Sequence, residues 1–242
     1  GFVIELKDSV SYINFENLKI EATGSSTKVI SLSGVTSFIT LKKDSLISST
    51  SGNVIDKPDG IWFKGITIEN NVLIGGRDAI SLYTNQNTLK DTIFSITGNE
   101  MYDFSHEGIT IKNARDGNIE GNYLITSKTN STGFSLEGVN FVDIVDNEVY
   151  VNARSIRFIN VTGSSTSRNL VTGNIWSSSL PLGNGVLRNV FSYGNYSDIV
   201  FNSIYGKMPE SGKAMTTLIG GTSVVFRNNI VHNDTVSNAL DF

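Results

Sequence analysis

The sequence predicts an all-β chain folded as one solenoid domain of about nine coils over residues 1–242. Three observations predict it. An asparagine-centred motif recurs along the chain, apolar residues alternate with period two between the motifs, and no stretch carries a convincing helical stripe over three turns. The expected elements are therefore short strands joined by bends.

The recurring motif has an anchor residue, an aliphatic or aromatic residue three positions before it and another two positions after it, as in "DGNIEGNYL" around Asn122. Eight anchors satisfy both rules, at spacings of 27, 28, 23, 25, 27, 28 and 27 residues. A ninth turn over residues 12–20 fits only if its anchor shifts to Leu18. The anchors are Asp44, Asn71, Asn99, Asn122, Asn147, Asn174, Asn202 and Asn229.

The strands are predicted from a second apolar pair between the anchors, such as Ile80 with Leu82 and Ile109 with Ile111. A repeat of 23 to 28 residues then holds about three strands of ~3–5 residues each. A unit so small cannot bury its own apolar face. Stacking equivalent strands in parallel buries that face, and Trp176, which stands at a core position of the motif, is expected to be buried.

Asparagine suits the bend of each coil for two reasons. It tolerates the left-handed backbone conformation that a tight bend requires. Its amide both donates and accepts, so amides stacked ~4.8 Å apart on successive coils can bond to one another or to neighbouring backbone. We therefore expect Asn122 and its equivalents to be architectural residues rather than catalytic ones.

Composition argues against several classes of protein. The formal net charge is −4, and Lys and Arg are scattered singly, so nucleic acid is not an expected partner. No run of about 18 apolar residues is present, so no membrane span is expected. The chain has no cysteine, which removes disulfides, thiolate nucleophiles and cysteine-based zinc sites.

The bends "GNEM" (98–101), "GNYL" (121–124) and "GNIW" (173–176), with strands of the "GITI" type, resemble the repeats of right-handed, single-stranded parallel β-helices of the pectin-lyase-like superfamily. That superfamily includes pectate lyases, polygalacturonases, alginate and chondroitin lyases, mannuronan epimerases and phage tailspikes. The resemblance covers essentially the whole chain and implies the fold. It also implies work on polysaccharides, although function resides in sites that differ between members.

Residues 4–25 and 60–71 also resemble repeats of large exported surface proteins of bacteria, which implies a secreted or cell-surface location. The chain opens without Met, and its final coil has no obvious cap. We therefore expect it to be part of a longer protein with flanking domains.

Candidate chemistry lies at the start of the "GITI"-type strands. Aligning successive coils on their first inward residue places Asp78 beside Glu107, roughly 5 Å apart at the backbone. Two such carboxylates can act as general acid and base, because their repulsion raises one pKa. Alternatively, they can hold Ca²⁺ together with backbone carbonyls. His106 adds a group that titrates near neutrality.

Two stretches carry a finer resemblance. "RDAI" (77–80) and "HEGI" (106–109) resemble the acidic strands of polygalacturonases, from which Ala79 and Glu107 depart. "YDFSHEGI" (102–109) resembles the tyrosine, aspartate and histidine motif of mannuronan epimerases, which implies roles for Tyr102 and His106.

The shortest spacings, 23 and 25 residues, are adjacent over residues 99–147. Short coils predict short loops and therefore a dip in the wall of the solenoid. Cations beside carboxylates around this dip would suit an anionic sugar, because they can neutralise a uronate carboxylate. The expected substrate-binding residues are Arg77, Tyr83, Lys112, Arg115, Glu137, Arg154 and Arg157.

Two functions follow from these residues. The first is a carbohydrate-active protein that acts on an acidic polysaccharide as lyase, hydrolase or epimerase, with Asp78, His106 and Glu107 as acid, base or metal-binding groups. The second is a non-catalytic surface module that binds glycans, acts as an adhesin or spaces other domains. In the second case the charged residues form a solvated ladder with no catalytic role.

Overall fold

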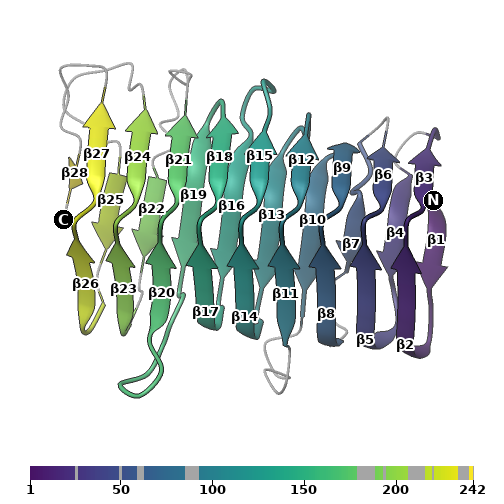
Figure 1. The fold of residues 1–242 in the computed structure, drawn as a ribbon, viewed down its shortest axis with the longest axis horizontal. Coiled ribbons are helices and arrows are strands. Elements are labelled where there is room, and N and C mark those ends of the chain that lie inside the picture. Colours follow the sequence, from purple (N-terminus) through teal and green to yellow (C-terminus); the bar gives the residue numbers. More distant parts are fainter. Residues whose placement is uncertain are drawn as a thin grey trace.

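The strands of the computed structural model form three parallel sheets of ten, nine and nine strands that run the length of the molecule (Figure 1). The chain visits the three sheets in turn, so each complete coil contributes one strand to each sheet. The predicted right-handed parallel β-helix of about nine coils is confirmed. The structure describes residues 1–24, 27–48, 51–58, 63–84, 93–178, 189–192, 195–206, 216–219, 221–233 and 240–241.

Each sheet is made of every third strand. The first sheet contains β1 (Phe2–Leu6), β4 (Lys28–Leu32), β7 (Ile55–Lys57), β10 (Asp78–Tyr83), β13 (Glu107–Lys112), β16 (Thr132–Glu137), β19 (Arg154–Ile159), β22 (Asn189–Ser192), β25 (Thr216–Ile219) and β28 (Leu240–Asp241). The second contains β2 (Ser9–Glu16), β5 (Val35–Lys42), β8 (Phe63–Glu69), β11 (Phe94–Thr97), β14 (Arg115–Glu120), β17 (Asn140–Val145), β20 (Asn169–Thr172), β23 (Ser197–Val200) and β26 (Val224–Arg227). The third contains β3 (Lys19–Ala22), β6 (Ser45–Ser48), β9 (Val72–Gly75), β12 (Glu100–Tyr102), β15 (Tyr123–Ile125), β18 (Glu148–Val151), β21 (Ile175–Ser178), β24 (Ser203–Gly206) and β27 (Ile230–Asn233).

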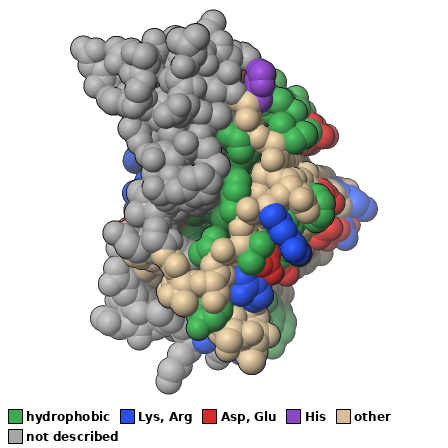
Figure 2. Space-filling view, turned by 90° about the vertical axis from the view of Figure 1, so that its left-hand side faces the viewer, with side chains coloured by type: hydrophobic (Ala, Val, Ile, Leu, Met, Phe, Trp, Pro, Cys, Tyr) green, Lys and Arg blue, Asp and Glu red, His purple; other side chains and the backbone are tan. Residues whose placement is uncertain are grey.

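The interior is filled by rows of apolar side chains that stack from coil to coil. Ile80 and Leu82 of β10 are register partners of Ile109 and Ile111 of β13, and all four side chains are fully buried. Trp176 is also fully buried, as expected from its place in the motif. In the end-on view of Figure 2, acidic and basic side chains are mixed on the outer side that faces the viewer in Figure 1. The described part of the chain contains no helix that could span a membrane.

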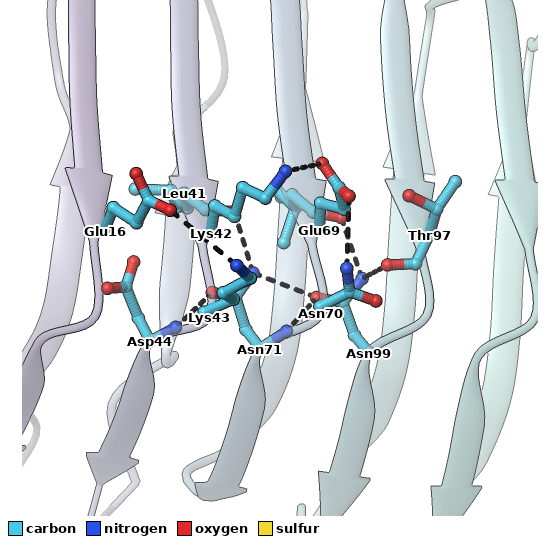
Figure 3. A network of polar contacts seen from close by, with 11 residues as sticks. Glu16, Leu41, Lys42, Lys43, Asp44, Glu69, Asn70, Asn71, Thr97 and Asn99 are labelled. Atoms are coloured by element: carbon cyan, nitrogen blue, oxygen red, sulfur yellow. Dashed lines mark hydrogen bonds and ion pairs between the residues drawn. The ribbon is translucent and has the colours of Figure 1, made fainter.

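A ladder of asparagine amides runs along the bend between the second and third sheets (Figure 3). Asn99 Oδ1 accepts from both the backbone N of Asn71, at 3.0 Å, and its Nδ2, at 2.9 Å. Asn71 Nδ2 also donates to the carbonyl of Leu41 at 2.9 Å. The same contacts recur at Asn122, which donates to Asn147 Oδ1. Asn122 is therefore architectural, as predicted.

The left-handed backbone of each bend lies one residue before the anchor, so the expectation that the anchor itself adopts it was wrong. Gly98, Gly121 and Gly173 have φ values of 63°, 61° and 68°, and Asn70 and Asp146 have φ values of 56° and 52°. The preceding residue makes the turn, and the anchor is left to point its amide along the stack. A Cβ at Gly98 would lie 2.3 Å from Asn70 Oδ1, an exposed side-chain atom that can move, so the left-handed φ is the main reason for glycine there.

The ladder begins with an acid in place of an amide. The backbone N of Leu18 donates to Asp44 Oδ1 at 2.8 Å, which supports the shifted anchor at Leu18. Asp44 Oδ2 is buried and has no hydrogen-bond partner in the described part of the chain. An asparagine at this position would place its amide nitrogen, a hydrogen-bond donor, where Asp44 has Oδ2. Burial raises the pKa of Asp44 above its ordinary value.

One inward position of the first sheet carries a charged residue. Lys57 ends β7 and is the register partner of Leu82, a core residue. Its side chain is fully buried, and its Nζ has no hydrogen-bond partner among the residues described. Burial lowers the pKa of Lys57 to about 8, and the charge of Asp56 partly opposes this shift. Burial therefore makes the charged form of this amine less favourable than it is for a lysine in water.

Replacing Asp44 by Asn should raise the free energy of unfolding at pH 7 by about 1–2 kcal/mol, because the amide nitrogen donates where the carboxylate oxygen has no partner among the described residues. The pKa of Asp44 is higher in the folded state, so the ionised wild-type residue becomes destabilising as pH rises through that value. The gain should therefore shrink towards acidic pH. Urea unfolding of both proteins between pH 3 and 8 measures it.

The matched control for this substitution is Asp8→Asn. Asp8 is an exposed carboxylate with a φ of 61°, which asparagine adopts as readily. The control should change the free energy of unfolding by less than about 0.5 kcal/mol. A lower stability of the Asp44→Asn protein than of wild type at pH 7 would contradict the account of the ladder.

Candidate metal centre on the first sheet

Asp78 and Glu107 open the neighbouring strands β10 and β13 of the first sheet, and their Cα atoms are register partners. The predicted adjacency of the two carboxylates therefore holds. His106 immediately precedes β13, and its backbone N donates to the carbonyl of Arg77 at 2.8 Å. That bond ties together the two turns that carry the polar side chains.

The turn into β10 depends on two glycines. Gly75 and Gly76 have φ values of 74° and 77°, where a side chain would be strained. A Cβ at Gly75 would also lie 2.1 Å from the carbonyl oxygen of Ser48 on the previous coil. The tight approach of the two coils fixes where Arg77 and Asp78 emerge at the start of the strand.

Asp78 is the buried centre of the cluster, with a side chain that is 3% exposed. Its Oδ1 lies 3.1 Å from His106 Nδ1 and accepts from the backbone N of Glu107 at 3.2 Å. Arg77 Nε lies 4.0 Å from the same oxygen. A buried carboxylate held by several donors keeps one orientation, so Asp78 is a rigid acceptor for a proton or a cation.

His106 is half exposed beside this buried carboxylate. The hydrogen bond with Asp78 raises the pKa of His106, burial opposes the shift, and the charge of Glu107 adds to it. Glu107 is itself held by Thr110, whose hydroxyl donates to Glu107 Oε2. The imidazole therefore lies between two carboxylates, and both favour its protonated form when no cation is present.

One ligand atom from each of Asp78, His106 and Glu107 lies within 4.8 Å of the other two. One imidazole nitrogen and two carboxylate oxygens form a donor set that suits divalent first-row transition metals. Calcium takes six to eight oxygen ligands, so the imidazole favours a transition metal over the Ca²⁺ that the sequence left open. The three residues can therefore act either as a metal site or as an acid and base.

Four of the expected substrate-binding residues continue along the same sheet. Lys112 Nζ lies 5.0 Å from the centre of the Tyr83 ring and 3.4 Å from Glu137 Oε2. Arg157 lies 3.7 Å from the same carboxylate oxygen. Burial, followed by the charge of Glu107, raises the pKa of Tyr83 to about 12. Tyr83 thus stays neutral and presents an aromatic face beside the cluster.

Arg154 has an unusual environment in this row. It opens β19, and its register partner Thr132 pairs in turn with Glu107. Its Nε is buried and has no hydrogen-bond partner in the described part of the chain. Burial lowers the pKa of Arg154 to about 10, Arg157 acts in the same direction, and Glu107 opposes them. The guanidinium therefore stays charged at neutral pH.

Arg115 lies elsewhere. It opens β14 of the second sheet, where its Nε lies 2.8 Å from Asp116 Oδ2 and its guanidinium lies 5.2 Å from the Phe141 ring centre. Sequence reasoning placed it with Lys112, but the bend at Asn113, with a φ of 55°, turns the chain onto another sheet between the two residues.

A pocket of about 420 Å³ adjoins the cluster on its N-terminal side, with Arg77, Asp78 and Tyr83 in its wall. The expected dip was placed over residues 99–147, whereas this pocket extends over the coil of β7. Its wall also includes Asn53 and Asp56, which sequence reasoning missed. Asp56 is the register partner of Ser81, so extending the coil alignment backwards to "VIDK" could have found it.

Comparison with known proteins identifies one family. The sequence model described as "Periplasmic copper-binding protein (NosD)" matches residues 17–222, which is most of the chain. No curated protein matches. Five chains of solved structures match. One is the crystal structure of the TibC-catalyzed hyper-glycosylated TibA55-350 fragment, which is 12% identical, covers 98% of this chain and 100% of its own, and has a TM-score of 0.17. This similarity is too low to support any argument.

The pKa of His106 should lie above 6.5 in the wild-type protein and fall in an Asp78→Asn variant, which loses the charged partner. A raised pKa in the folded state adds stability that is fully present below the unfolded pKa and is lost as pH rises through the folded value. NMR titration of the imidazole signals, assigned with a His106→Gln protein, measures both values. A wild-type pKa at or below 6.5 would refute the described contact.

Proposed function

Because the chain belongs to the NosD family of periplasmic copper-binding proteins, we propose that it binds a copper(II) ion through Asp78, His106 and Glu107. The observation that carries the proposal is the approach of three donor atoms to within 4.8 Å of one another. Two of these residues begin adjacent strands, so the fold itself holds the ligands in place. We also propose an extracytoplasmic location, in keeping with the family description.

The donor chemistry supports the divalent ion. Copper(I) prefers thiolate and thioether ligands, but the chain has no cysteine. Met101 is fully buried in the core, and the other methionines, Met208 and Met215, lie outside the described residues. Imidazole and carboxylate groups suit copper(II), which is also the tightest binder of the divalent first-row series.

Binding of copper(II) requires only small changes in the surrounding side chains. Metal–ligand bonds to nitrogen and oxygen are about 2 Å long, so Glu107 must turn slightly from Thr110 towards the imidazole. A protonated His106 must first lose one imidazole proton, and Asp78 exchanges the imidazole contact for the metal. Affinity should consequently fall as the solution becomes more acidic.

The His106→Gln and Glu107→Gln variants should each lower copper(II) affinity at least about tenfold. Calorimetry with copper(II), zinc(II) and calcium measures the order of affinities, which should be copper first and calcium last. Electron paramagnetic resonance should show nitrogen coupling in wild type that disappears in His106→Gln.

The matched control is His232→Gln, since His232 lies on β27 of the third sheet, far along the solenoid. This variant should bind copper(II) as wild type does. Equal affinity of the His106→Gln protein and wild type, or calcium bound as tightly as copper, would eliminate the proposed site.

Arg154 supports a second proposed function, the binding of an acidic polysaccharide along the same face. Its guanidinium is charged at neutral pH, and its buried Nε has no hydrogen-bond partner among the described residues. Lys112 and Arg157 lie on the same sheet, so a row of uronate carboxylates would meet cations there. Asp78 and Glu107 would then supply acid and base for a lyase, hydrolase or epimerase. If the polysaccharide is bound but not cleaved or epimerised, the same cations would belong to a glycan-binding, adhesin or spacer module.

Binding to polygalacturonate, alginate or chondroitin should weaken about tenfold in Arg154→Ala, because a buried charged contact is lost. Reducing-end release, together with absorbance near 235 nm, separates hydrolysis from elimination, and Glu107→Gln should abolish either product. Binding without product would leave the non-catalytic module. A folded protein that binds none of these polymers would end this second proposal.

A further inference from the structure

The outer surface of the third sheet carries a stripe of tyrosines. We define the tyrosine stripe as Tyr102 on β12, Tyr123 on β15 and Tyr150 on β18, together with Glu100 and Glu148, which begin β12 and β18. The ring centres of Tyr102 and Tyr123 are 6.1 Å apart, and those of Tyr123 and Tyr150 are 5.8 Å apart. The strands β12, β15 and β18 are neighbours in the third sheet (Figure 1), and their register places the three rings in a zigzag across them.

The stripe repeats every second coil. Tyr102 donates its hydroxyl proton to Glu100 Oε2 at 2.6 Å, and Tyr150 donates to Glu148 Oε2 at 3.2 Å. Ile125, which is 38% exposed, lies between the two tyrosines in the same register row. Adjacent strands are ~4.8 Å apart, so the two tyrosine–glutamate pairs are about 10 Å apart along the solenoid.

The row continues beyond the stripe with the same period. Tyr150 pairs through Ser177 with Tyr205, again two strands away. Tyr205 is 39% exposed. Three tyrosines in one row are therefore spaced by two coils each, which is the arrangement expected of a surface that reads a repeating polymer rather than a single small molecule.

We propose that the tyrosine stripe binds a neutral, β-1,4-linked polysaccharide laid along the solenoid axis. In such a polymer successive sugars are turned over, so every second ring presents the same face, and the disaccharide repeat matches the two-coil spacing. Tyrosine rings stack on the apolar faces of pyranose rings, with Ile125 as an apolar contact between them. This site is separate from the proposed metal centre.

The charge of the tyrosine stripe indicates which class of polymer it binds. Glu100 and Glu148 are exposed carboxylates, and they act as acceptors towards the tyrosine hydroxyls. They can accept further hydrogen bonds from sugar hydroxyls. They would repel uronate or sulfate groups at the same place, which excludes the acidic polymers that suit the first sheet.

Affinity electrophoresis tests which class of polysaccharide binds. The gels contain soluble glucomannan, xylan or a cellulose derivative, and parallel gels contain the acidic polymers alginate and polygalacturonate. At least one neutral β-1,4-linked polymer should retard the wild-type protein. Tyr150→Ala should weaken that retardation about tenfold. Alginate retardation, if present, should be unaffected by the substitution.

Two variants keep the test independent of folding. Tyr150→Phe keeps the ring and loses only the bond to Glu148, so it should retain binding. Tyr12→Ala removes an aromatic that is 78% exposed on the second sheet, and it should bind as wild type does. Thermal unfolding confirms that each variant is folded.

Oligosaccharide length provides the sharpest readout. Two tyrosine–glutamate pairs separated by one disaccharide repeat should bind a β-1,4-linked tetrasaccharide or hexasaccharide clearly more tightly than the disaccharide by calorimetry. No retardation by any neutral polymer would overturn the proposal. Equal binding by folded Tyr150→Ala would do so too, and the rings would then serve only to stabilise the coils. Neither result would bear on copper binding.

Discussion

The side-chain amide ladder is the constraint on which the other features depend. From Asn71 to Asn202, each asparagine of the ladder donates its backbone N and its Nδ2 to the amide oxygen of the next coil, as Asn122 does to Asn147, and Nδ2 also donates to a strand carbonyl. A coil cannot slip by one residue without breaking all three buried contacts. The ladder therefore fixes the register of the second and third sheets directly, and the stacked core rows extend that register to the first.

Fixed register turns a repetitive sequence into defined surface sites. Side chains separated by a whole coil in sequence become neighbours about 4.8 Å apart. That is how Asp78 meets His106 and Glu107, and how Tyr102 and Tyr150 come to share one row. The rigid strands supply the positions, while the chemistry of each site depends on a few outward residues that do not affect the fold.

Sequence reasoning could predict whatever follows from the period. The anchor positions predicted the coils, the stacked amides and the pairing of Asp78 with Glu107, because all of these depend only on counting residues from one repeat to the next. It failed where position within a bend matters: Arg115 follows the turn at Asn113 and so lies on another sheet. The burial of Lys57 was also not predicted, because a lysine in a core row breaks the apolar pattern from which the rows are recognised.

The tyrosine stripe shows why outward residues are harder to read than inward ones. Tyr102, Tyr150 and Tyr205 stand three places after their anchors, at positions where the other coils carry isoleucine, serine or histidine, so no rule of burial selects them. Their two-coil spacing becomes apparent only when alternate coils are compared. A solenoid transmits strain mainly between neighbouring coils. Tyr102 is four residues from His106 in the chain, whereas Tyr150 lies two coils beyond Tyr102. A change at Tyr150 therefore reports on the third sheet with little disturbance of the first.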